Sequence, residues 1–264
     1  MVPRSNSRLY IPYAAFTIHI NLANLPLRGN MPSNPDFADS YFKLHAKGSD
    51  LRARQHSLDF LWVKRFLQKG EFLSFDSNPQ INIIDIGCAA GDFSRLFSPI
   101  GKVYGVEINE SESIKARKVL FQVGDSYPLD VTFDLILIRG TLQHLPTSKE
   151  FFDFVATNLK SKGVLAILAN PNSSSPMFKR TGTLPALNVY KGFSSNFEVF
   201  NRHSLENRLK GIEFSEIEIK YDYFRTPYAR PCLDIPLGIL SLLTGRNFGR
   251  PFPGNMFNWI GRRI

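Results

Sequence analysis

The chain has 264 residues, of which 43% are hydrophobic and 21% charged, a composition typical of a globular protein with a substantial core. Its formal net charge of +9 is compatible with an anionic substrate, a nucleic acid or a membrane surface, and demonstrates none of them. Two cysteines, Cys88 and Cys232, are too few for a disulfide framework or a cysteine-built zinc site. We therefore expect a reducing compartment and a cytoplasmic location.

The N-terminal part of the chain lacks the pattern of a membrane-spanning or targeting segment. Residues 9–27 are the most apolar stretch, but prolines and asparagines interrupt them. A transmembrane helix needs a run of about 18 or more apolar residues, and a signal peptide needs a small-residue cleavage site. We therefore predict no transmembrane helix and interpret residues 1–48 as a partly irregular extension. The remainder, residues 49–264, is predicted to form one domain.

An amphipathic helix is expected first, because apolar residues recur at helical spacing between residues 49 and 69. Strands and helices then alternate. Strands are predicted at residues 81–86, 102–107, 119–123, 133–138 and 164–169. Helices are predicted between them at residues 92–97, 110–118 and 148–159. Such alternation predicts an α/β fold with a parallel sheet and helices on both faces, which binds ligands at the carboxyl ends of its strands.

Two irregular, proline-rich stretches interrupt this pattern at residues 171–202 and 223–254. Between them, residues 204–210 read as a helix and residues 215–223 as an alternating strand, and residues 255–262 read as a last strand. Long irregular segments in a compact domain are usually functional or disordered. We therefore interpret both stretches as insertions that form a lid on the acceptor side of the ligand-binding edge.

The turn after the first strand is the strongest signal in the chain, and two nucleotide-binding patterns compete for it. In the dinucleotide pattern G-x-G-x-x-G, Asp92 would take the sixth place, where a small residue is needed and a pyrophosphate would lie nearby. The alternative D-x-G-x-G-x-G spacing places Asp85, Gly87, Ala89 and Gly91 at its four positions. This is the turn of adenosine cofactors that lack phosphates. Because an acid at Asp92 would repel a pyrophosphate, we favour the second pattern over an NAD-dependent oxidoreductase.

On these residues the chain resembles the class I S-adenosylmethionine-dependent methyltransferases. The similarity is good over roughly residues 50–170 and looser over residues 200–264. It is carried by Asp85–Gly91, Glu107, Phe133–Leu137, Leu142–Leu145 and Leu159–Leu165. It implies a Rossmann-like sheet of seven mostly parallel strands with an antiparallel last strand, and S-adenosyl-L-methionine as cofactor. One position departs from the pattern: Ala89 replaces the middle glycine, and because alanine avoids positive φ, we expect a slightly different turn.

The resemblance also implies roles for the acids along this edge. Glu107 would accept hydrogen bonds from both ribose hydroxyls and Asp125 from the adenine amino group, although a helix-capping acid and an Asx turn are the respective alternatives. Asp85 would need donors because it ends an apolar strand; turn amides or the cofactor's ammonium group could supply them, or it could only brace the turn. The candidate cofactor residues are Asp85, Gly87, Cys88, Ala89, Gly91, Glu107, Ile108, Gly124, Asp125 and Arg139.

His144 is the candidate catalytic residue, because it follows the fourth strand and a neutral imidazole could deprotonate an acceptor hydroxyl. The alternative is that it only shapes the pocket. Candidate acceptor-binding residues are Gln143, His203, Arg225 and Arg230. No cluster of residues has the spacing of metal ligands, so no metal is predicted.

These features predict an enzyme that transfers a methyl group from S-adenosylmethionine to a small-molecule or glycan/lipid-type acceptor, with oxygen as the favoured nucleophile. The preference for oxygen rests on the absence of an N/D-P-P-Y motif after the fourth strand, where Arg139–Leu142 stands instead. A nucleic-acid methyltransferase remains an alternative because of the positive charge, but it is not favoured because no basic run is present. A non-catalytic, cofactor-binding interaction protein is the other alternative.

Overall fold

The computed structural model describes residues 49–69, 81–145, 148–175, 198–222 and 256–264. Its elements, in chain order, are α2 (Ser49–Lys69), β1 (Ile81–Ile86), η2 (Ser94–Phe97), β2 (Gly101–Val106), α3 (Glu110–Ala116), β3 (Gln122–Gly124), β4 (Phe133–Arg139), η3 (Leu142–His144), α4 (Ser148–Asn158), β5 (Leu159–Pro171), α7 (Arg202–Arg208), β6 (Phe214–Asp222) and β7 (Met256–Arg263). The predicted extension at residues 1–48 lies outside the described residues. Within the described ranges, no helix is both long and apolar enough to cross a lipid bilayer.

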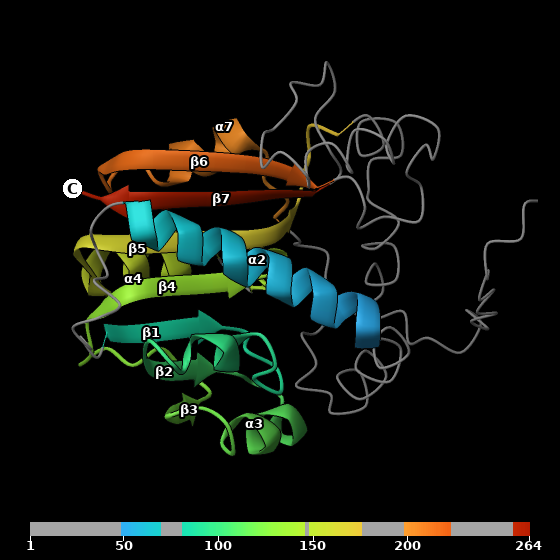
Figure 1. Ribbon diagram of the computed structural model, residues 1–264. Helices are drawn as coiled ribbons and strands as arrows, with labels where there is room; N and C mark the ends of the chain where they lie inside the picture. The colour runs from blue at the N-terminus through green and yellow to red at the C-terminus, as the bar shows by residue number, and fades with distance from the viewer. Residues whose placement is uncertain (1–48, 70–80, 146–147, 176–197, 223–255) are drawn as a thin grey trace, which may run out of the picture.

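The seven strands form one sheet in the order β3-β2-β1-β4-β5-β7-β6 (Figure 1). Strands β1 to β5 pair in parallel, whereas β7 lies between β5 and β6 and is antiparallel to both. This arrangement confirms the predicted Rossmann-like fold class, including its antiparallel last strand.

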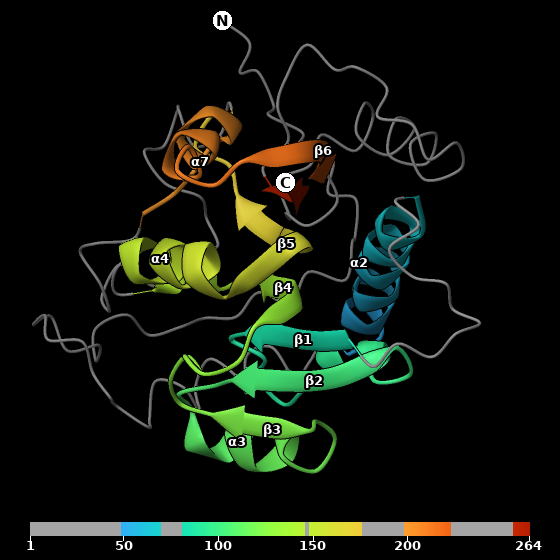
Figure 2. The same cartoon turned by 90° about the vertical axis from the view of Figure 1, so that its left-hand side faces the viewer.

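Helices cover both faces of the sheet: α2 lies on one face, and α4 and α7 lie on the other (Figure 2). The central strands β4 and β5 are therefore buried on both sides, which explains why they read as continuous apolar runs. In β4, Leu135 and Leu137 pack in the core cluster beneath α2, whereas Ile136 and Ile138 pack in the cluster beneath α4.

The third strand was predicted at the wrong residues. In the structure, Val119 and Leu120 donate backbone hydrogen bonds to the carbonyl of Ala116 and extend the turn that ends α3. Leu120 is buried in the core from this turn, so its apolar character reflects packing rather than a strand. Strand β3 begins only at Gln122 and has three residues.

Two other elements differ in length from their predictions. The predicted helix at residues 92–97 is a single 3-10 turn, η2. Strand β5 begins at Leu159 instead of residue 164, because Leu159 pairs with Phe133 before an irregularity that includes Lys162 at a φ of 62°. The remaining elements lie within a few residues of their predicted bounds.

Candidate functional site

The carboxyl ends of β1, β2, β3 and β4 are aligned at one edge of the sheet. Ile86 is in register with Val106 on one side and with Ile138 on the other, and Val106 is in register with Gly124. The residues that follow these strand ends therefore lie along a common edge. The structure brings the predicted cofactor residues together there.

The turn after β1 contains three residues with positive φ: Gly87 (75°), Ala89 (48°) and Gly91 (81°). The amides of Gly87 and Cys88 both donate to the carbonyl of Val106, which ties the turn to the end of β2. A Cβ atom at Gly87 would lie 2.3 Å from Oγ1 of Thr141, so only glycine fits there. The expectation of an altered turn at Ala89 was wrong, because the alanine adopts the left-handed conformation that a glycine would adopt.

Replacing Ala89 with glycine is expected to raise the free energy of unfolding by about 1 kcal/mol, because alanine pays roughly 1–2 kcal/mol in the left-handed region and glycine loses part of this gain through chain entropy. Urea denaturation measures the change. Ala90→Gly is the matched control: Ala90 does not have positive φ, so this substitution should destabilise the protein. Equal effects of the two substitutions would contradict the prediction.

Glu107 follows β2, and its residue is 9% exposed. Its Oε2 atom accepts a hydrogen bond from the Ala89 amide and its Oε1 atom from the Asn109 amide, both at 2.8 Å. Burial raises the pKa of this carboxyl, and the two amides oppose that effect. A carboxylate offers about four lone-pair positions. Glu107 can therefore keep both amides and still accept two further donors, such as a pair of hydroxyl groups.

Asp85, in β1, is 2% exposed, and only one of its two carboxyl oxygens has a hydrogen-bond partner among the described residues. Ser94 donates to its Oδ2 atom at 2.5 Å, whereas Oδ1 is buried with no hydrogen-bond partner among the described residues. The pKa of Asp85 is raised to about 7, chiefly by burial. The Ser94 hydroxyl and the charge of Arg139 act to lower this pKa, and the charge of Glu107 acts to raise it. A buried, unpartnered acceptor at a ligand-binding edge fits a ligand that brings a donor, such as an ammonium group.

The other predicted cofactor residues at this edge differ in exposure. Ile108 is 86% exposed and presents an apolar side chain next to Glu107. Asp125 is exposed at the end of β3, and the carbonyl of Gly124 accepts from the Glu107 amide at 2.9 Å. Cys88 is buried, and burial raises the pKa of its thiol. Its side chain packs over Gly105, so Cys88 contributes packing beneath the turn.

Arg139, which ends β4, contacts residues that the sequence analysis did not single out. Its Nε atom lies 2.9 Å from Oδ2 of Asp59 on α2, and its guanidinium group lies 5.4 Å from the centre of the Phe93 ring. Asp59 lies on the same helical face as the buried residues Val63 and Phe66. The helical spacing between Asp59 and these two residues is visible in the sequence. An acid on the buried face of a helix indicates a polar partner on the element that the helix packs against.

Gln143 and His144 lie in η3, directly after β4. The Gln143 amide nitrogen donates to the carbonyl of Gly140 at 2.9 Å, which fixes the orientation of the amide, and it lies 3.0 Å from Nε2 of His144. In this geometry Nε2 of His144 accepts from Gln143, so its lone pair points at the amide. Oε1 of Gln143 is buried with no hydrogen-bond partner among the described residues.

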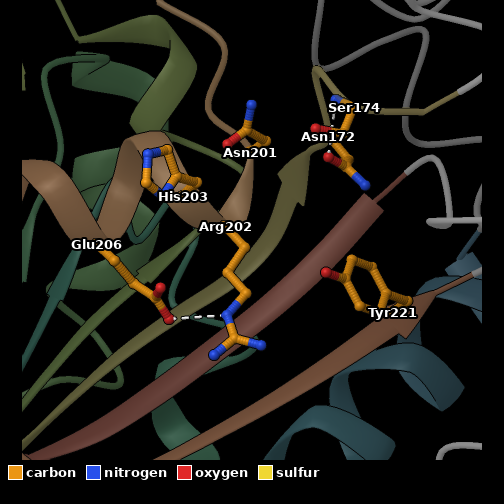
Figure 3. A pocket seen from close by; sticks show the side chains of 7 residues that line it. All are labelled: Asn172, Ser174, Asn201, Arg202, His203, Glu206 and Tyr221. Carbon is orange, nitrogen blue, oxygen red and sulfur yellow. Dashed lines mark hydrogen bonds and ion pairs between the residues drawn. The ribbon is translucent and has the colours of Figure 1, made fainter. Parts of the chain in front are cut away.

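His203 does not join this group. It lies on α7, in a polar pocket beyond β5 that also contains Asn172, Arg202 and Tyr221 (Figure 3). Arg225 and Arg230, like most of the two predicted lid insertions, lie outside the described residues. Among the residues that the structure describes, no group of three or more His, Cys, Asp or Glu side chains could hold a metal ion.

The chain matches the family described as a methyltransferase domain over residues 54–219, which is more than half of its length. It therefore belongs to this family. The match and the fold confirm the prediction of a class I S-adenosylmethionine-dependent methyltransferase.

Solved structures with the same fold include two methyltransferases. One is an S-adenosylmethionine-dependent methyltransferase of Thermotoga maritima, described as a possible histamine N-methyltransferase; it is 20% identical, with a TM-score of 0.57, and the match covers 86% of this chain and 96% of that one. The other is the plantazolicin methyltransferase BpumL in complex with S-adenosylhomocysteine; it is 16% identical, with a TM-score of 0.55, and the match covers 88% and 92% of the two chains. The comparison with curated protein sequences gave no match.

Proposed function

We propose that S-adenosylmethionine binds along the edge formed by the ends of β1, β2 and β3, with its ribose at Glu107 and its ammonium group at Asp85. The main support for this proposal is a pair of buried carboxylates at adjacent strand ends. Glu107 can accept further hydrogen bonds, and Asp85 has an oxygen with no hydrogen-bond partner among the described residues. The exposed side chain of Ile108 would flank the adenine, and Asp125 would accept from the adenine amino group.

When bound, S-adenosylmethionine would supply an electrophilic methyl group. The contribution of the chain is then mainly to hold the acceptor in line with that group, because orientation alone can account for much of the rate. We retain His144 as the candidate base. Proton removal through its Nε2 atom requires the Gln143 amide to turn away, since that amide now donates to the same lone pair.

We further propose that the acceptor is a small molecule or a glycan/lipid-type molecule methylated at oxygen. The segment Arg139–Leu142, which replaces an N/D-P-P-Y motif, supports oxygen over an adenine amino group. The described ranges hold 20 lysines and arginines against 18 acidic residues, so little of the net charge of +9 resides in the described domain. This balance does not favour a polyanionic acceptor such as a nucleic acid.

A thermal-shift comparison of S-adenosylmethionine, S-adenosylhomocysteine and NAD tests the cofactor site. We expect the first two to raise the melting temperature and NAD to leave it unchanged, because only a ligand that binds the folded state stabilises it. Transfer of a radiolabelled methyl group to hydroxyl-bearing and amine-bearing acceptors then tests the choice of oxygen. Stabilisation by NAD alone would overturn the proposal.

Glu107→Ala is expected to weaken S-adenosylmethionine binding about 10- to 100-fold, because hydrogen bonds to a charged group contribute roughly 1.5–3 kcal/mol. Isothermal titration calorimetry measures the change. Glu110→Ala is the matched control, since Glu110 is an exposed acid three residues further along the chain. An unchanged affinity in Glu107→Ala, or an equal loss in both variants, would remove Glu107 from the site.

A further inference from the structure

A polar pocket lies past the carboxyl end of β5 (Figure 3). Because β5 and β1 are parallel, the pocket lies at the same edge of the sheet as the proposed cofactor site. Its volume is about 340 Å³, within the range of small-ligand sites. Every residue that lines it has a side chain capable of hydrogen bonding. These residues are Asn172, Ser174, Asn201, Arg202, His203, Glu206 and Tyr221.

Local hydrogen bonds fix the walls of this pocket. Asn172 is 1% exposed, and its Oδ1 atom accepts from the Ser174 amide at 3.0 Å, which closes a turn after β5. On the opposite wall, Asn201 caps α7 by accepting from the Ser204 amide at 2.9 Å, and the Ser204 hydroxyl accepts from the Asn201 amide. Because these hydrogen bonds already hold the pocket walls in place, ligand binding would cost little conformational entropy.

The charges of the pocket largely cancel. Nε of Arg202 lies 2.9 Å from Oε1 of Glu206, and this pair contains the only carboxylate and guanidinium among the lining residues (Figure 3). The remaining lining groups are amides, a hydroxyl, an imidazole and the phenol of Tyr221, which offer both donors and acceptors. An anion would have to compete with Glu206 for Arg202. A neutral ring that carries several hydroxyl groups could instead form hydrogen bonds with both residues and stack on the Tyr221 ring.

The pocket also lies within reach of the proposed methyl-transfer site. Neighbouring strands are about 4.8 Å apart, and each residue adds about 3.3 Å along a strand. The end of β5 lies two strands from β1 and four residues past Ile167, which is in register with Ile138 and thus with Ile86, so it is roughly 15 Å from the end of β1. Strand β6 lies two strands further. A molecule that spans this distance could place one unit in the pocket and another at the end of β4.

We propose that this pocket is a subsite for a neutral, polyhydroxylated unit of the methyl acceptor, such as a sugar ring. The inference rests on the proposed function for its role in methyl transfer, but the binding of such a unit can be tested independently. It narrows the proposed acceptor to an extended molecule with a glycan-type end.

Ligand-observed NMR on the full-length protein tests this with maltose as the neutral probe, glucuronic acid as the anionic probe and triglycine as the peptide probe. We expect maltose to bind best. Tyr221→Ala should weaken maltose binding by at least about fivefold, as expected for the loss of one hydrogen bond and a stacking surface. Asn207→Ala, on α7 but outside the pocket, should leave maltose binding unchanged.

Glu206→Gln, on α7, provides a second variant. It removes the carboxylate from Arg202 and should raise the affinity for glucuronic acid several-fold. Preferential binding of glucuronic acid or triglycine to the unmodified protein, or maltose binding that is insensitive to Tyr221→Ala, would overturn the proposal.

Calorimetry with S-adenosylmethionine on the same proteins separates this inference from the proposed function. All three variants should bind the cofactor with unchanged affinity. If the unmodified protein does not bind S-adenosylmethionine but its maltose binding still depends on Tyr221, the proposed function is refuted and the sugar subsite is supported.

Discussion

Arg139→Met is expected to lower the free energy of unfolding by about 3–5 kcal/mol, the usual cost of removing one partner of a buried ion pair. The side chain of Asp59 is 2% exposed, and Nε of Arg139 lies 2.9 Å from its Oδ2 atom. Without the guanidinium, the carboxylate of Asp59 would lose this ion pair while it remains buried between α2 and the sheet. The contact of Arg139 with the Phe93 ring would also be weakened. Denaturation in urea measures the loss.

Two comparisons separate this cause from a general effect of the substitution. Arg95→Met removes an arginine whose pair with Asp92 is exposed and 3.8 Å long, so it should cost less than about 1 kcal/mol. The double variant Asp59→Leu/Arg139→Met replaces both charges with apolar groups and should recover most of the stability. A double variant as unstable as Arg139→Met alone would show that the ion pair is not the cause.

Asp85→Asn is expected to change how the stability of the protein depends on pH. The pKa of Asp85 is raised from 3.8 to about 7 in the folded state, chiefly by burial. The folded state therefore holds this proton more tightly than the unfolded state does. The stabilisation that comes from this tighter proton binding is complete below about pH 4, and it is lost progressively as the pH rises to about 7. Asparagine does not titrate, so the variant should lack this loss.

The size of the effect follows from the same linkage. One pKa unit corresponds to about 1.4 kcal/mol, so between pH 4 and 8 the variant should gain up to roughly 4 kcal/mol of stability relative to the unmodified protein. Urea denaturation across this pH range measures the gain. Asp92→Asn, at an exposed aspartate, is the control and should show no such trend. A pH-independent difference between Asp85→Asn and the unmodified protein would refute the assignment.

The same experiment bears on the proposed cofactor site. If the ammonium group of S-adenosylmethionine lies at Asp85, it stabilises the ionised carboxylate, and a saturating concentration should reduce the loss of stability between pH 4 and 8. An undiminished loss in the presence of the cofactor would place the ammonium group elsewhere.

Local sequence patterns predicted the central strands well and the peripheral ones less well. Strands β1 and β4 are buried on both faces, so burial requires a continuous apolar run that is visible without knowledge of the partners. Strand β3 has three residues at the sheet edge, and the apolar residues before it pack from a turn. A short apolar segment fits either structure, and only the contact of Leu120 with the core decides between them.

The sequence by itself determined the order of the elements, the fold class and the residues of the turn after β1, because periodicity and glycine spacing are local properties of the chain. It also indicated the acid at Glu107 that follows the second strand. Only the tertiary structure decided which distant side chains come together: Arg139 pairs with Asp59 eighty positions earlier, and Asn172 and Tyr221 line the same polar pocket. Such contacts depend on how helices and strands cross the sheet, and the spacing of residues along the chain does not specify them.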